Sequence, residues 1–136
     1  MSVAISIAGR ASSSPSPHRS EQLLLDVARG LHRGGLPAHR LEETIAALAE
    51  RLEVHASFYS TPTAIFASFR DEHSLAPRTH ILRVEPGDID LGRQEAVDDI
   101  IQKLVAGELD IEAGQQQIQA LHDAPPRYPA CVTILA

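Results

Sequence analysis

The sequence contains no tryptophan and a single cysteine, Cys131, among its 136 residues. One cysteine excludes an intrachain disulfide and a cysteine-rich zinc site, as is usual in a reducing cytoplasm. Aromatic residues make up only 4% of the chain, so we expect an aliphatic core. No window reaches the roughly 18 to 20 continuous apolar residues that span a bilayer. The apolar start MSVAISIAGR lacks the leading positive charge of a secretory signal.

Basic clusters and metal-ligand spacings are also missing. The formal net charge is −6 and the twelve basic residues are scattered, whereas nucleic-acid binding requires clustered lysine and arginine. None of the seven histidines stands at an HxH or HExxH spacing, so the sequence predicts no metal site. A glycine-rich phosphate loop is absent as well, and we expect no bound cofactor.

The amino-terminal part of the chain predicts a tail followed by two helices. Residues 1–20 are expected to form a disordered tail, because RASSSPSPHR has almost no apolar content. Ser20 is a candidate N-cap for a helix that begins at Glu21 and ends at the Gly34-Gly35 pair. A second helix follows Pro37, with an apolar stripe at spacings of four, three and four: Leu41, Ile45, Leu48 and Leu52.

A period of two then replaces the helical period, which predicts strands. Residues 54–59 alternate as a half-buried strand, residues 64–69 (AIFASF) are apolar enough for a more central strand, and residues 79–85 form a third. Asp90 and Asp110 are candidate N-caps for two further helices, the second of which is rich in glutamine and should depend on docking. The order predicts an α+β fold, a small, mostly antiparallel three-stranded sheet with two helices before and two helices after it, the helices covering one face.

The segment FYSTPTAIF, residues 58–66, crowds four hydroxyl side chains around Pro62. Serine or threonine catalysis also needs a base with an orienting partner, and the neighbouring sequence supplies no complete set. His55 would share a strand face with Ser57 and Tyr59, which leaves open a hydroxyl–imidazole pair or a simple polar face. Pro62 cannot donate to a sheet ladder, so a turn or bulge is expected here. The same polar groups could instead receive a small ligand with ammonium and carboxylate groups.

Five segments taken in order resemble the N-terminal domain of the threonine/serine exporter family: GLPAHRLEETIAALAERL, FYSTPTAIFASF, THILRVEP, DIDLGRQEAVDDIIQKLVAGELD and PPRYPACVTILA. The resemblance implies a cytoplasmic domain at the inner face of the cell membrane. In the family this domain precedes a membrane channel that exports small hydroxy amino acids, or in split systems a dicarboxylate, using the proton gradient. The expected division is a domain over residues 21–123, then a linker and the start of a truncated transmembrane segment over residues 124–136.

The resemblance also assigns candidate substrate-binding residues: Arg40, Glu42, Tyr59, Thr61, Thr63, Asp90 and Arg93. For the four charged residues among them, helix caps and surface ion pairs are the structural alternative. The expected partners are a membrane-embedded exporter half or subunit and threonine or serine, with a homo-oligomer as a further candidate.

These expectations favour a regulatory or substrate-presenting domain that is not an enzyme and does not transport alone. Two alternatives stay open. One is a hydrolase-like enzyme that uses a hydroxyl of the TPT loop with His55, and the other is a structural oligomerisation domain.

Overall fold

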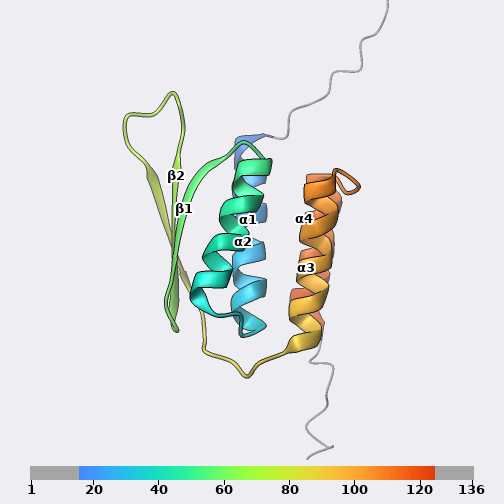
Figure 1. Cartoon of the computed structure of the whole chain (residues 1–136). Coiled ribbons are helices and arrows are strands. Elements are labelled where there is room, and N and C mark those ends of the chain that lie inside the picture. The colour runs from blue at the N-terminus through green and yellow to red at the C-terminus, as the bar shows by residue number, and fades with distance from the viewer. Residues whose placement is uncertain (1–15, 125–136) are drawn as a thin grey trace, which may run out of the picture.

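A computed structural model of the protein describes residues 16–124. Two helices come first, then three strands, then two helices (Figure 1): α1 Pro17–Arg33, α2 Ala38–Arg51, β1 His55–Ser60, β2 Ala64–Arg70, β3 Arg78–Arg83, α3 Leu91–Ala106 and α4 Ile111–Asp123. This order confirms the α+β class predicted from the sequence. The expectations for residues 1–15 and 125–136 lie outside the described residues.

The start of α1 differs from the expectation. The helix begins at Pro17 after Ser16, so Ser20 is an interior residue and not the N-cap. Proline suits the first helical position, because its fixed φ is already helical and its missing N–H has no partner to lose there. The helix thus begins about one turn earlier than the sequence pattern indicated, and Ser20, which is 3% exposed, is buried against the rest of the domain.

Helices α1, α2 and α3 end with the same backbone motif, in which one residue adopts a left-handed conformation. Each motif contains a hydrogen bond from an amide to the carbonyl five residues earlier: Leu36 to Leu31, Val54 to Ala49 and Glu108 to Lys103. The left-handed residues are Gly35 (φ 79°), Glu53 (φ 56°) and Gly107 (φ 76°). Glu53 has a Cβ atom, unlike the two glycines, so its left-handed backbone conformation costs roughly 1 kcal/mol.

The sheet is an antiparallel meander in the order β1-β2-β3, so β2 is the central strand, as its apolar sequence predicts. Its inner face carries the buried and half-buried apolar side chains of the three strands: Ala56, Phe58, Ile65, Ala67, Phe69 and Leu82. Phe69 on this face is 1% exposed and meets the Phe58 ring edge to face at 5.8 Å. In Figure 1, α1 and α2 lie against this face, and α3 and α4 lie beyond them. The outer face of the sheet is left open by the described residues.

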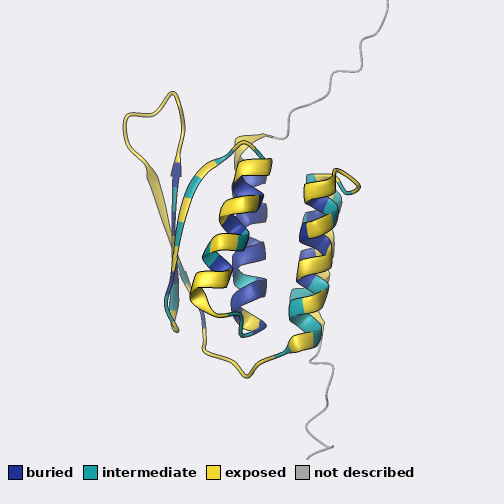
Figure 2. Ribbon diagram, viewed as in Figure 1, coloured by how far each residue is buried: buried dark blue, intermediate teal, exposed yellow. Residues whose placement is uncertain are grey.

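Helix α1 is therefore the middle of the molecule and is buried along most of its length (Figure 2). The core is aliphatic, as expected, and Leu23, Leu24 and Val27 are fully buried in it. Asp90 and Asp110 cap α3 and α4 as predicted, accepting hydrogen bonds from the amides of Arg93 and Ala113 at 3.0 and 2.7 Å.

A polar cluster attaches the glutamine-rich α4 to α1. The Asp26 carboxylate, in a residue only 1% exposed, accepts hydrogen bonds from the amides of Gln22 at 3.1 Å and Gln119 at 3.0 Å. His122 Nε2 donates to the backbone carbonyl of Asp26 at 3.1 Å, and burial lowers the pKa of the His122 imidazole. The expected docking of α4 thus depends on buried polar contacts as well as on apolar packing.

Candidate functional site at the TPT end

The segment that contains Pro62 is a turn that joins β1 to β2. Thr61 N donates to the carbonyl of Ala64 at 2.8 Å, and the Thr61 hydroxyl accepts from the amide of Ala64 at 3.0 Å. Within the turn, the Thr61 hydroxyl thus takes the place of a backbone carbonyl as the acceptor for the Ala64 amide. Pro62 and Thr63 are exposed, so the Thr63 hydroxyl is free to meet solvent or a ligand.

Two side chains fix this turn to the helices behind it. His32 on α1 lies 3.0 Å from the Thr61 carbonyl through its Nε2. A carbonyl only accepts, so Nε2 carries the proton, and the buried Nδ1 of His32 has no hydrogen-bond partner among the described residues. Glu42 on α2 accepts a hydrogen bond from the Ser60 amide at 2.7 Å. Since β1 is an edge strand, this carboxylate satisfies an amide that no neighbouring strand reaches.

Asp90 and Arg93 form a second anchored pair, at the start of α3. Asp90 N donates to the carbonyl of Gly34 at 3.1 Å, which ties the start of α3 to the end of α1. The Arg93 guanidinium donates to the carbonyls of Leu121 at 2.5 Å and Ala124 at 3.5 Å, and its side chain is only 11% exposed. These contacts cap α3 and α4, as the structural alternative for this pair expects.

The remaining candidates lie on the surface. Arg40, on the first turn of α2, is 3.6 Å from Glu43 in an exposed ion pair. It lines a cleft of about 270 Å³ together with Thr44 and Gln94. Tyr59 points away from the helices on the outer face of the sheet and is 64% exposed.

All seven candidate residues nevertheless lie toward one end of the domain, which we call the TPT end. It comprises the link at residues 34–37, the turn at residues 61–64, the crossover at residues 84–90 and Ala124 (Figure 1). The helices and strands alternate in direction, so α1 ends, α2 begins, β1 turns into β2, α3 begins and α4 ends here. A cleft of about 650 Å³ opens at this end, lined by the crossover with Arg33, Arg93 and Ala124. The seven residues share an end but not a single pocket.

His55 lies at the opposite end of β1, opposite Arg70. Thr61 follows six residues further along the extended chain, a distance of about 20 Å. His55 therefore cannot act as a base for a hydroxyl of the TPT turn, and the histidine that does reach the turn is His32. The sequence pattern could not reveal this contact, because 29 residues separate its partners.

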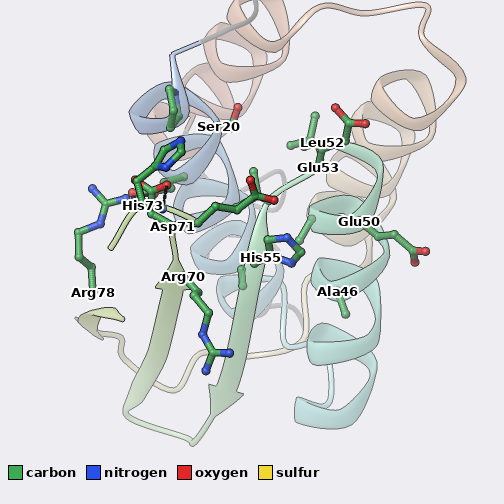
Figure 3. Close-up of a pocket in the computed structure, with 16 residues that line it drawn as sticks. Ser20, Ala46, Glu50, Leu52, Glu53, His55, Arg70, Asp71, His73 and Arg78 are labelled. Atoms are coloured by element: carbon green, nitrogen blue, oxygen red, sulfur yellow. Dashed lines mark hydrogen bonds and ion pairs between the residues drawn. The ribbon is translucent and has the colours of Figure 1, made fainter. Parts of the chain in front are cut away.

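A cleft of about 1030 Å³ opens at the end of the molecule around His55 (Figure 3). An ion pair between Arg78 and Glu21, 2.5 Å apart, occupies its wall beside the start of α1. In Figure 3, His73 and Asp71 lie near this pair, while Glu50 lies across the cleft on α2. Within residues 16–124, no group of three or more histidine, cysteine, aspartate or glutamate residues could hold a metal ion.

The described residues thus define an α+β domain whose proline-containing hairpin turn is held by two helices. The family model for the threonine/serine exporters, ThrE, matches residues 22–136. The chain belongs to this family, as its sequence resemblance predicts.

Relatives in fungi match the same region. The chain is 30% identical over 115 residues to the uncharacterized protein C7D4.12c of Schizosaccharomyces pombe, covering 85% of this chain and 15% of that protein. It is 24% identical over 115 residues to pheromone-regulated membrane protein 10 of Candida albicans, covering 85% of this chain and 10% of that protein. The chain therefore spans only a small part of these relatives. No solved structure matches it. None of the helices between residues 16 and 124 has the length and apolar character needed to cross a membrane.

Proposed function

We propose that this domain is a cytoplasmic, regulatory or substrate-presenting part of a threonine/serine exporter-like system and acts with a membrane-embedded half. The observation that carries the proposal is the position of the candidate residues. They lie toward the same end of the domain as Ala124, after which the sequence continues into the segment expected to lead to the membrane. Family membership and a relative named as a membrane protein support the same assignment.

The cleft at the TPT end has the groups that a free amino acid needs. Arg33 offers a guanidinium for an α-carboxylate, and the exposed carboxylates of Glu85 and Asp88 offer acceptors for an α-ammonium. Arg93 lines the same cleft, but its donors already bond to α4. Of the two TPT threonines, Thr63 is exposed and could contact a substrate hydroxyl, whereas the Thr61 hydroxyl is hydrogen-bonded within the turn. The proposed contacts are thus Arg33 and the crossover carboxylates, with Thr63 as a further candidate because its carbonyl accepts a hydrogen bond from the Val84 amide at the start of the crossover.

Calorimetric titration of the 136-residue chain with L-threonine and L-serine tests this proposal. L-valine is the matched ligand control, because it has the shape of threonine without the hydroxyl. We expect saturable heat at millimolar threonine and serine, and weaker heat with valine. Heat indistinguishable from dilution for all three ligands, with an unchanged melting temperature, would refute substrate binding by this domain.

Two arginines of α1 provide a matched pair of variants. Arg33→Gln removes the guanidinium in the cleft and should weaken threonine binding about tenfold, the usual size of a lost charged hydrogen bond. Arg19→Gln changes an exposed arginine at the other end of the same helix, where it pairs with Glu112 at 3.4 Å. It should leave the threonine affinity unchanged. Equal affinities for both variants would move the site away from this cleft.

A further inference from the structure

The outer face of the sheet carries a row of three large apolar side chains that the described residues leave uncovered. Tyr59 lies opposite Phe66, and Phe66 lies opposite Ile81, so the three form one line across the strands. They are 64%, 38% and 66% exposed, and the rings of Tyr59 and Phe66 are 6.4 Å apart. The solvent face of an antiparallel sheet is normally polar. A contiguous apolar row there marks a contact surface.

The charged side chains at the outer-face positions within the three strands have one sign. Arg83 stands beside the row at the next outer position of β3, and Arg70 and His55 stand at the far end of the face. The other outer-face positions of the three strands hold small or hydroxyl residues and no carboxylate: Ser57, Ala64, Ser68 and Thr79. The whole chain has a formal net charge of −6, so this face is basic on an acidic molecule. Its complement is a surface that is both anionic and apolar.

We propose that the outer face lies against an anionic lipid surface, with Tyr59, Phe66 and Ile81 at the headgroup level and Arg83 at the phosphates. Tyrosine and arginine favour this interface, since each combines an apolar body with a polar or charged tip, and Phe66 and Ile81 add apolar area to the contact. A stable protein partner would need roughly 800 Å² on each side with a larger apolar core than three side chains provide.

Three apolar side chains give only a weak membrane contact, which is sufficient for a domain that is already attached to a membrane protein. This step of the inference rests on the proposed function. A domain joined to a membrane half meets the lipid at a high effective concentration, so a contact too weak to recruit a free protein still sets its orientation. The apolar row lies in the half of the sheet nearest the TPT end, with the Ala64–Arg83 pair between the row and the turn. The contact would hold the TPT end close to the membrane surface.

Co-sedimentation of the 136-residue chain with phosphatidylglycerol-containing vesicles and with pure phosphatidylcholine vesicles tests the inference. At millimolar lipid and low salt, we expect more binding to the anionic vesicles. Ile81→Ser and Arg83→Gln should each reduce that bound fraction at least threefold, and about 0.5 M salt should act like Arg83→Gln. Leu75→Ser is the matched control, because Leu75 is fully exposed in the loop at the other end of β2 and β3.

A bound fraction that neither Ile81→Ser nor Arg83→Gln changes would overturn the inference, even if other parts of the chain bind vesicles. A dimer in sedimentation velocity that Ile81→Ser dissociates would overturn it in favour of a protein interface. Both residues are exposed, so melting temperatures near that of the parent chain verify that the variants are folded. Failure here leaves the threonine titration intact, because Ile81 and Arg83 lie outside the cleft used there.

Discussion

Glu42 closes the free edge of the sheet at the TPT end, and its replacement by alanine should destabilise the whole domain. Its carboxylate accepts the Ser60 amide at 2.7 Å, and Ser60 is 8% exposed. A hydrogen bond to a charged group contributes about 1.5–3 kcal/mol, and its loss leaves a buried amide without a partner. Alanine regains a few tenths of this through helix propensity. We therefore expect Glu42→Ala to lower the free energy of unfolding by about 2 kcal/mol, or the melting temperature by about 8 °C.

The next residue supplies the control. Glu43 is also a glutamate on α2, but it is exposed and pairs with Arg40 at 3.6 Å on the surface. Glu43→Ala should change the free energy of unfolding by less than about 0.5 kcal/mol. Urea unfolding followed by far-ultraviolet circular dichroism measures both, because the chain has no tryptophan to report by fluorescence. Glu42→Gln keeps a neutral acceptor and should fall between the two alanine variants. Equal stabilities of Glu42→Ala and Glu43→Ala would refute the argument.

Three further predictions concern stability. Burial lowers the folded-state pKa of His122 below 6.5, so the unfolded chain protonates first, and stability present above about pH 6.5 is lost as the pH falls. His122→Gln should flatten the melting temperature between pH 7.5 and 5, and an unchanged slope would contradict this. Glu53→Gly should raise the free energy of unfolding by about 0.5 kcal/mol in urea titrations, because glycine accepts the left-handed φ of 56° without strain; a loss of stability would count against it. Arg93→Lys should cost about 1.5 kcal/mol in the same assay, since lysine cannot reach both carbonyls of α4. The exposed Arg40→Lys is its control, and equal effects would show that the Arg93 contacts contribute nothing.

The parts of the fold that follow from local pattern were predictable. The apolar stripe of α2 is correct for Leu41, Ile45 and Leu48, which are fully buried, whereas Leu52 follows the end of the helix and is half-buried. The alternation of β1 and the central position of β2 are also correct, because one buried face imposes a period of two. The predicted start of α1 was wrong because the low apolar content of residues 10–19 was interpreted as a tail, although a serine followed by proline, Ser16-Pro17, is itself a signal for a helix start.

The long-range polar contacts were not predictable. Aspartate is usually exposed, yet Asp26 is buried, because α4 brings glutamine amides to it from far along the chain. His32 looks like one of several scattered histidines, and its contact with Thr61 depends on how the hairpin folds back over α1. The candidate residues chosen from the sequence included Thr61 but not His32, the histidine that contacts its carbonyl.

The contacts at the TPT end form one continuous path from Ala124 to the hairpin turn. The path runs from the carbonyls at the end of α4 through Arg93 and Asp90 to Gly34, and then from His32 to Thr61. In mechanical terms, a force applied to the chain beyond Ala124 would act on all of these contacts together and not on the end of α4 alone. The turn at residues 61–64 would then move together with the TPT end as one unit. Displacement of the chain after Ala124 would therefore change the orientation of the exposed Thr63.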